Sequence, residues 1–296
     1  MTRLRDRFEA LLLDLDGTLY RGNAVISGAP QALSAGEGAQ ALRYVTNNAS
    51  RSAAAVAAHL ADMGFAAAED EVVTSAQAAA HVLADRLTPG ATVLVVGTDD
   101  LAAEIERAGL VPVRRWETAV PAAVVQGHSP QTAWPDLAEA AYAIRAGALW
   151  VAANTDATLP TERGLAPGNG SMVAAVRAAT DIEPIVAGKP YAPLLEDALT
   201  RAGTRSALVV GDRLDTDIDG ACCVGLESLL VLTGVSTLAD LAKQPEDRLP
   251  DYVSDSLDAL NHPVVQEDPA RLSDGDVADQ VAERLRRHPG RAIAIV

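Results

Sequence analysis

Two aspartates follow an apolar run near the start of the chain. Residues 10–13, Ala-Leu-Leu-Leu, lead into Asp14 and Asp16, and Gly17 comes next. A run this short and this apolar is typical of a buried parallel β-strand. Because side chains alternate along a strand, both carboxylates leave on the same side if the strand continues through them. Gly17 then lets the backbone turn sharply and approach a ligand closely.

These neighbouring carboxylates repel each other. The cost is about 1 kcal/mol at 4 Å in water and about 4 kcal/mol at an intermediate dielectric. A bound cation, or a proton shared between the two groups, is the usual way to remove this cost. The alternative is an ordinary turn, because Asp-Gly after a strand is also common hairpin chemistry. The two aspartates alone leave both interpretations open.

Polar side chains also follow two other predicted strands, at 41–45 and 207–211. They are Thr46, Asn47 and Asn48 after the first of these strands, and Asp212 and Asp217 after the second. In parallel α/β sheets, ligands bind beyond the carboxyl ends of the strands. We therefore expect these clusters to meet Asp14 and Asp16, although they lie far apart in the sequence.

One lysine stands in an unusual place. Only two of the 24 Lys and Arg residues are lysines, and Lys189 lies between Gly188 and Pro190. Pro190 suits the first position of a helix, which we predict over 191–202. A compact ammonium beside the free N–H groups of a helix start suits a phosphate. The alternative is a solvated surface lysine.

Together these four motifs, in this order, resemble those of the haloacid dehalogenase superfamily. The βα segment between the second and third motifs resembles the large C2-type cap, as in the NagD-like, pyridoxal phosphate, phosphoglycolate and glycerol-3-phosphate phosphatases. The motifs and the residues around them are most similar to those of the bacterial glycerol-3-phosphate phosphatases. The resemblance implies hydrolysis of a small phosphate monoester, and glycerol 3-phosphate is the first candidate substrate. The alternatives are 2-phosphoglycolate or another sugar or nucleotide phosphate, and a non-catalytic sugar-phosphate sensor.

The resemblance also implies a role for each motif. Asp14 would be the nucleophile that forms an aspartyl-phosphate. Asp16 would protonate the leaving alkoxide and then activate water. Thr46 and Lys189 would hold the phosphoryl oxygens. A dehalogenase of the same superfamily is a further alternative, but it would need neither Asp16 nor a metal.

A magnesium ion follows from the same resemblance. It would bind the Asp14 carboxylate, the Asp16 carbonyl and the Asp212 carboxylate, with Asp217 supporting these ligands. The donor types agree, because Mg²⁺ prefers a few carboxylates plus substrate phosphate over a full protein cage.

The cap is expected to set the substrate. The stretch 156–171 resembles the specificity region of such caps. Leu159 stands where the pyridoxal phosphatases have a histidine, which favours a small aliphatic ester as substrate. The further residues expected to contact substrate are Gly17, Asn47, Asn48 and Arg51. For Arg51, an exposed position at the start of a helix is an equal alternative.

The elements predict an α/β fold with a doubly wound, mostly parallel Rossmann-like core and an inserted α/β C2-type cap domain. Residues 1–87 and 183–262 would form the core, and residues 88–182 the cap. Residues 263–296 form a tail to which the sequence assigns no role, with one helical pattern at 276–287.

The composition of the chain limits which binding partners and which cellular compartment are expected. The formal charge of −16 argues against nucleic acid or an anionic membrane as partner, since both need basic patches. No apolar run approaches the ~20 residues of a membrane helix. The two cysteines, Cys222 and Cys223, are adjacent and form no disulfide framework. We expect buried thiols and a cytoplasmic protein that binds a small phosphorylated metabolite, with a homo-oligomer left open.

Overall fold

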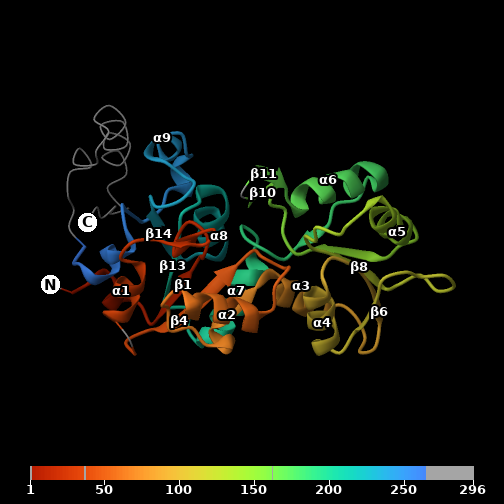
Figure 1. Cartoon of the computed structure of the whole chain (residues 1–296), viewed down its shortest axis with the longest axis horizontal. Helices are drawn as coiled ribbons and strands as arrows, with labels where there is room; N and C mark the ends of the chain where they lie inside the picture. Colours follow the sequence, from red (N-terminus) through yellow and green to blue (C-terminus); the bar gives the residue numbers. More distant parts are fainter. Residues whose placement is uncertain (1, 37, 162, 265–296) are drawn as a thin grey trace. The chain divides into compact units, whose positions relative to one another are not determined.

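The computed structural model describes residues 2–36, 38–161 and 163–264 (Figure 1). The chain packs into two compact units, each built from separate stretches of sequence. Within the described residues, the first unit is drawn from Met1–Val45, Ala58–Glu71 and Ala198–Val296, and the second from Thr46–Ala57 and Val72–Asp197. None of the helices in the described stretches is both long and apolar enough to cross a membrane.

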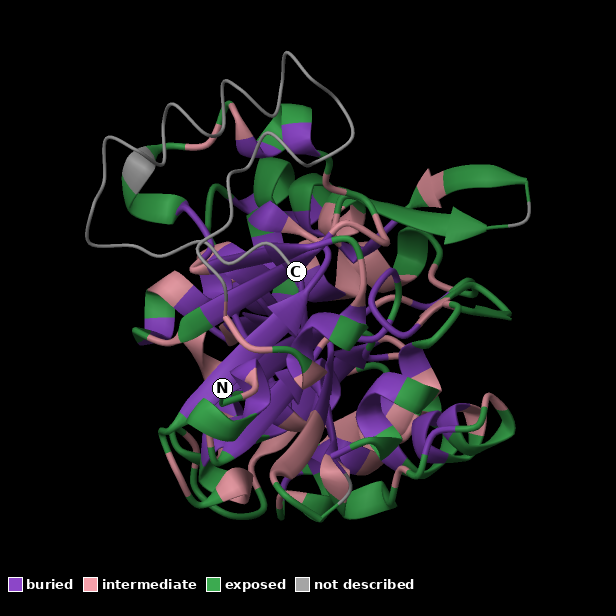
Figure 2. Cartoon of the chain, turned by 90° about the vertical axis from the view of Figure 1, so that its left-hand side faces the viewer, coloured by how far each residue is buried: buried purple, intermediate pink, exposed green. Residues whose placement is uncertain are grey.

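The first unit contains a parallel sheet whose strands are, in order, β15, β14, β13, β1 and β4. Their bounds are Tyr252–Ser254, Glu227–Val231, Ala207–Gly211, Ala10–Leu13 and Ala41–Thr46. Every residue of β1 and β13 is buried, as the purple strands of Figure 2 show. Strands buried on both faces have continuous apolar sequences, which explains Ala-Leu-Leu-Leu and Ala-Leu-Val-Val-Gly.

Short helices and one hairpin complete the first unit. They are η1 Leu4–Arg7, β2 Tyr20–Arg21, β3 Ala24–Val25, α1 Ala29–Ser34, η2 Glu69–Glu71, η3 Leu214–Ile218, α8 Asp219–Val224, α9 Leu238–Leu241, η4 Glu246–Arg248 and η5 Leu257–Asn261. Leucines of η3, α9 and the segment before β15 pack on β14 and β15 in one apolar cluster. Two helices, α2 Ala53–Asp62 and α7 Ala192–Ala202, have residues in both units.

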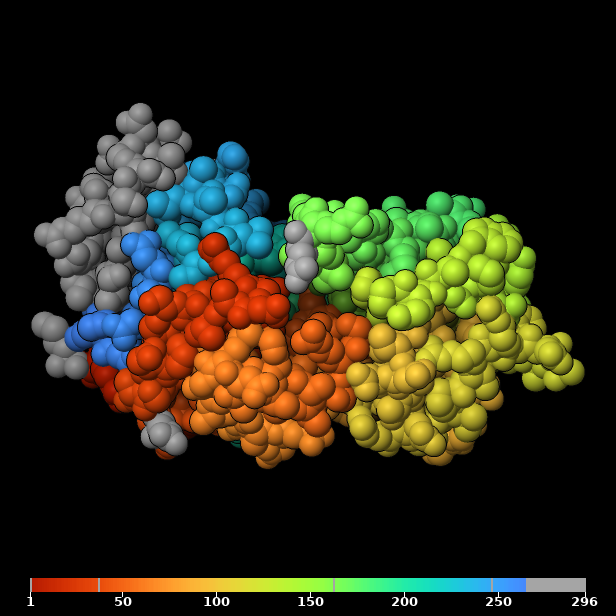
Figure 3. Space-filling model, viewed as in Figure 1, coloured from red at the N-terminus to blue at the C-terminus, as the bar shows by residue number. Residues whose placement is uncertain are grey.

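A second parallel sheet lies in the second unit, in the order β12, β9, β8, β6 and β7. The elements are β5 Val72–Thr74, α3 Ser75–Ala84, β6 Thr92–Val96, α4 Asp99–Arg107, β7 Val111–Val113, β8 Ala123–Gln126, α5 Trp134–Arg145, β9 Leu149–Ala152, β10 Thr158–Thr161, β11 Gly164–Pro167, α6 Asn169–Thr180 and β12 Ile185–Val186. Helices α5 and α6 share one core with the sheet, while α3 contacts α4 and β9. The segments coloured yellow to green form one continuous surface (Figure 3).

The architecture confirms the predicted fold class, a doubly wound and mostly parallel α/β protein with a second α/β sheet. The domain boundaries at 87/88 and 182/183 stay a prediction. The helical pattern at 276–287 and the tail from 265 on lie outside the described residues.

Strand β1 ends at Leu13, so the condition under which Asp14 and Asp16 would leave the strand on the same side is not met. Two local predictions are wrong. Helix α7 begins at Ala192, and Pro190 is not its first residue, because the Tyr191 N–H bonds the Gly188 carbonyl in a turn. The cysteines are not buried: Cys222 is half-buried and Cys223 exposed, because the face of α8 that packs inward carries Gly220, Ala221 and Val224.

Candidate active site

The order of strands in the first unit places a topological switch point beside β1. The chain leaves β1 for β4 on one side, whereas β13, β14 and β15 lie on the other side. At such a reversal of strand order, the loops that follow the two neighbouring strands separate, and ligands bind beyond their carboxyl ends. Asp14 follows β1 directly and Asp212 follows β13 directly. The topology thus places both carboxylates at the switch point.

Three carboxylates gather at this point. Asp14, Asp212 and Asp217 each offer an oxygen, and these oxygens lie within 4.8 Å of one another. Asp212 and Asp217 are at most 1% exposed, and Asp14 is half-buried. Burying like charges together is unfavourable unless a cation or a proton compensates them. Hard carboxylate oxygens are the donors that Mg²⁺ and Ca²⁺ prefer, so the group can hold a divalent cation.

The Asp212 carboxylate is held by a loop that the sequence analysis missed. The Val235 N–H donates to Asp212 Oδ2 at 2.6 Å, and the Ser236 N–H donates to the Asp212 carbonyl at 3.1 Å. Gly234 and Gly17 both lie so close to this carboxylate that a Cβ on either would overlap it. Two glycines therefore let the backbone close around the acid from both sides.

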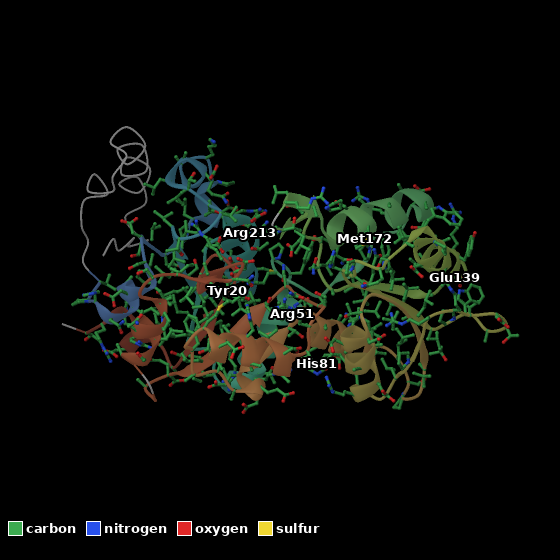
Figure 4. All side chains as sticks on the ribbon, in the orientation of Figure 1. Tyr20, Arg51, His81, Glu139, Met172 and Arg213 are labelled. Atoms are coloured by element: carbon green, nitrogen blue, oxygen red, sulfur yellow. The ribbon has the colours of Figure 1, made fainter. Side chains whose placement is uncertain are left out.

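Asp217 is fixed by a π-helical turn after β13. Its carboxylate accepts the Arg213 N–H at 3.1 Å, and its own N–H bonds the Arg213 carbonyl at 3.0 Å. The guanidinium of Arg213, a residue labelled in Figure 4, instead pairs with Asp215 at 2.8 Å, and this hydrogen bond lowers the pKa of Asp215. Asp215 is thus paired within its own loop, whereas Asp217 faces the cluster.

Asp16 lies in the turn between β1 and the β2–β3 hairpin, where it forms an isolated bridge with Tyr20. The adjacent Gly17 N–H bonds the Tyr20 carbonyl at 2.7 Å and closes the turn. Although Asp16 as a whole residue is exposed, the surrounding protein removes water from its carboxyl group and raises the pKa of Asp16. A hydrogen bond from the Gly22 backbone and the charge of Arg21 act in the opposite direction. A raised pKa favours the protonated form, which can donate a proton.

We expect Gly17→Ala to disturb Asp212 more than it disturbs the fold. Gly17 has a φ of +96°, and the added Cβ would overlap the Asp212 carboxylate. The control is Gly203→Ala, where φ is +72° and nothing lies within 4 Å of the added Cβ. Both variants carry backbone strain of about 1 kcal/mol, but only Gly17→Ala should weaken divalent-cation binding, by about 10- to 100-fold. Calorimetric titration with Mg²⁺ measures this, and equal affinities in the two variants would contradict the assigned contact.

In the second unit, Asn47 holds the backbone of Lys189. The Lys189 N–H donates to Asn47 Oδ1 at 2.8 Å, and Asn47 Nδ2 donates to the Lys189 carbonyl at 3.0 Å. Lys189 is 3% exposed, which rules out the solvated surface lysine. Asn47, predicted to contact substrate, therefore uses its amide to fix Lys189. Its Nδ2 also lies 3.3 Å from the Asp156 carboxylate.

The neighbours of Asn47 build a tight loop after β4. Thr46 is buried, and its Oγ1 accepts the Asn48 N–H at 3.1 Å. Asn48 Oδ1 accepts the Ser50 N–H at 2.8 Å, so this side chain closes a turn before α2. Arg51, labelled in Figure 4, is exposed just before that helix begins. The structure thus gives Asn48 a role in the turn, and the expected substrate contacts of Asn48 and Arg51 stay predictions.

Leu159 lies on an exposed hairpin formed by β10 and β11. It pairs with Ala166 and is 37% exposed, while Leu165 on the opposite strand is 73% exposed. The sequence predicts no strands here.

A separate cavity of about 550 Å³ lies in the second unit, beyond the carboxyl end of β6. Thr98, Arg114 and Ser129 line it, together with residues of the neighbouring loops. None of the residues predicted for the active site is among its lining residues.

Two family models match the chain. Residues 11–111 match the haloacid dehalogenase-like hydrolases, and residues 186–260 match a second model described as HAD-hydrolase-like. Both matched stretches carry residues of the carboxylate cluster, and the second stretch also contains Lys189.

Curated proteins and solved structures agree with these matches. The chain is 57% identical over 261 residues to the D-glycerol 3-phosphate phosphatase of Mycobacterium tuberculosis, covering 88% of this chain and 73% of that protein. It is 38% identical to the acid sugar phosphatase of Staphylococcus aureus, covering 79% and 90%.

Among solved structures, the glycerol phosphate phosphatase of M. tuberculosis in complex with magnesium superposes with a TM-score of 0.88 at 47% identity, covering 100% of this chain and 96% of that one. The p-nitrophenyl phosphatase of Archaeoglobus fulgidus reaches 0.78 at 29% identity, covering 86% and 98%. Sequence, fold and the motifs at the carboxyl ends of the strands agree: the chain belongs to the haloacid dehalogenase-like hydrolase family.

Proposed function

We propose that this protein is a Mg²⁺-dependent phosphatase that releases phosphate from a small phosphate monoester. Glycerol 3-phosphate is the first candidate substrate. The observation that carries the proposal is the convergence of Asp14, Asp212 and Asp217 within 4.8 Å at the switch point of a parallel sheet. The choice of glycerol 3-phosphate is supported by the 57% identity to a protein named for that activity.

The chemistry assigned to Asp14 and Asp16 is a double displacement. An Asp14 oxygen bonds to phosphorus while the bond from phosphorus to the ester oxygen breaks, and Asp16 gives its proton to the departing oxygen. Asp16, now a carboxylate, takes a proton from water. The resulting hydroxide attacks phosphorus, and Asp14 leaves as a free carboxylate beside inorganic phosphate. The raised pKa of Asp16 supports its role as the proton donor.

Charge on the phosphoryl oxygens needs compensation in both steps. The proposal assigns hydrogen bonding to the Thr46 hydroxyl and positive charge to the Lys189 ammonium. Asp14, the Asp16 carbonyl and Asp212 would hold Mg²⁺, with Asp217 supporting them. The three clustered carboxylates fit such an ion in donor type and spacing. When bound, the ion neutralises charge on the nucleophile and on the phosphoryl group.

We assign substrate selection to a cap formed by residues 88–182. The separate β12-β9-β8-β6-β7 sheet supports a folding unit of its own, and the exposed Leu159 hairpin supports a surface that can cover a small ester. A second candidate substrate class is sugar phosphates, which the 38% identity to an acid sugar phosphatase favours. The core of residues 1–87 and 183–262 would carry the chemistry.

We also propose that the protein works in the cytoplasm. Neither Cys222 nor Cys223 forms a disulfide in the described part of the chain, and the Cys223 thiol is exposed. An exposed free thiol suits a reducing compartment.

The test is phosphate release from a panel of monoesters, scored by kcat/KM. The panel holds both enantiomers of glycerol 3-phosphate, 2-phosphoglycolate, a hexose phosphate, a nucleoside monophosphate and pyridoxal phosphate. We expect one glycerol 3-phosphate enantiomer to lead by at least about tenfold, which corresponds to about 1.4 kcal/mol of transition-state binding. A hexose phosphate in the lead would favour the second candidate, and tight binding without release of phosphate would favour a sensor.

Removal of metal should stop phosphate release. With EDTA we expect less than about 1% of the activity to remain, and excess Mg²⁺ should restore it, because three clustered carboxylates lose their counter-charge. Mg²⁺ at 100 times its Kd should also stabilise the fold by about 2.7 kcal/mol. A melting curve measures this separately, and Asp212→Asn should remove the effect. Full activity in EDTA would contradict the metal assignment.

A further inference from the structure

Three asparagines form a continuous chain of hydrogen bonds that ends at Lys189. Asn47 makes the last link, because its amide group donates to one main-chain atom of Lys189 and accepts from another, at 3.0 and 2.8 Å. An amide that bonds both the N–H and the C=O of one residue fixes the position and the direction of that residue's backbone. Gly188 permits this approach, since a Cβ there would lie 2.6 Å from Asn47 Oδ1.

Asn154 holds Asn47 in turn. Asn154 follows strand β9, is 5% exposed and donates from Nδ2 to the Asn47 carbonyl at 2.7 Å. The Ser75 hydroxyl, at the start of α3, donates to the same carbonyl at 2.6 Å. Two donors on one carbonyl fix the peptide group from which the Asn47 side chain extends.

Asn169 makes the first link. It opens helix α6, is 1% exposed and donates from Nδ2 to the Asn154 carbonyl at 2.7 Å and to the Gln126 carbonyl at 3.3 Å. The glycines on either side of it allow the close approach: a Cβ on Gly168 or Gly170 would overlap the carbonyl of Asp156 or Thr155. The Gly-Asn-Gly sequence thus lets α6 begin directly on the loop that carries Asn154.

The network connects four separate segments, and each of its hydrogen bonds has a main-chain atom as donor or acceptor. Buried hydrogen bonds of this kind are costly to break, because a donor or acceptor left unpaired costs about 1–3 kcal/mol. They therefore favour a single arrangement of the Lys189 backbone. A charged group that is misplaced by about 1 Å can cost about 100-fold in rate.

We propose that Asn154 and Asn169 are positioning residues that act through Asn47 to set where the Lys189 ammonium lies. The inference rests on the proposed function, since it assumes that Lys189 acts on the phosphoryl group. Under this proposal, the Gly168-Asn169-Gly170 stretch contributes to catalysis as well as to the start of helix α6.

The first test is Asn154→Ala, which removes the donor to Asn47. We expect kcat for glycerol 3-phosphate to fall about 10- to 100-fold while KM changes less than about threefold, because a misplaced ammonium affects the transition state most. The matched control is Thr180→Val. Thr180 is 6% exposed in the same helix as Asn169 and donates to the Val176 carbonyl at 2.9 Å, apart from the network. This control should lower the melting temperature as much as Asn154→Ala does and leave kcat unchanged.

The second test repeats Asn154→Ala in a protein that already carries Lys189→Met. If Asn154 acts through Lys189, the second substitution should cost less than about twofold there, since the group that it positions is gone. An equal loss in both backgrounds would overturn the positioning role. Normal activity of Lys189→Met alone would overturn the proposed function instead, so the two failures are distinguishable. Ser75→Ala, which removes only a hydroxyl, serves as the substitute if Asn154→Ala does not fold, with the same non-additivity expected.

Discussion

Asp14→Asn should reduce phosphate release by about 10⁴-fold or more, which is the scale of losing a catalytic nucleophile. The amide keeps the shape of the side chain but lacks the negative charge that attacks phosphorus. It also weakens the cation site, because one of the three clustered carboxylates is replaced by a neutral oxygen. Steady-state release of phosphate from glycerol 3-phosphate measures the loss.

A covalent intermediate gives this prediction a second measurement. Acid quenching with ³²P-labelled substrate should leave label on the unchanged protein and none on Asp14→Asn. Asp62→Asn is the matched control, since Asp62 is exposed at the end of α2 and should lose neither label nor turnover. Label on Asp14→Asn at the normal level would show that another residue is the nucleophile.

The buried central strands could be predicted because each of them is an apolar run bounded by polar residues or glycine. Parallel strands buried on both faces leave this pattern directly in the sequence, and β1, β13 and β8 follow it. The β10–β11 hairpin has a different origin: every residue of its two strands except Ala166 is exposed, so burial imposes no pattern on their sequences. Its strands exist because they pair with each other, which apolar periodicity does not report.

The carboxylate cluster could be predicted in the same way, from acids that follow buried strands. The contacts that shape the cluster could not. Gly234 and Val235 reach Asp212 through the loop after β14, and nothing in Thr-Gly-Val-Ser distinguishes that loop from an ordinary turn. Such a contact depends on how two loops meet in space, and a single sequence does not state this.

Asn154 fits the pattern of a polar residue after a buried strand, but the sequence analysis did not select it as a site residue. It follows the buried strand β9, as Asp14 follows β1, and a polar residue in that place is the signal used for the other clusters. The role of Asn47 was also missed, because a polar residue beside a phosphate motif suggests contact with substrate. The structure instead gives the Asn47 amide two bonds to the Lys189 backbone.

Lys189→Met should lower kcat/KM by about 10²- to 10³-fold, or about 2.7–4 kcal/mol, as expected when one preorganised group that stabilises transition-state charge is removed. The methionine keeps much of the side-chain volume, so the loss reports the charge. Lys189 is 3% exposed, and a charge in such a place acts through a lower effective dielectric than one in water. Inorganic phosphate should also inhibit this variant less strongly, because the same ammonium attracts the product.

Two further variants separate charge from geometry at this position. Lys189→Arg keeps the charge, but the planar guanidinium is larger and directs its donors differently, so we expect it to recover less than about a tenth of the lost rate. Lys243→Met changes the chain's other lysine, which is exposed and pairs only loosely with Asp240 at 3.8 Å, and it should leave kcat/KM unchanged. Full activity of Lys189→Arg would mean that charge alone suffices there. The asparagine network fixes the direction of the Lys189 backbone, and such precise placement would then not be needed for activity.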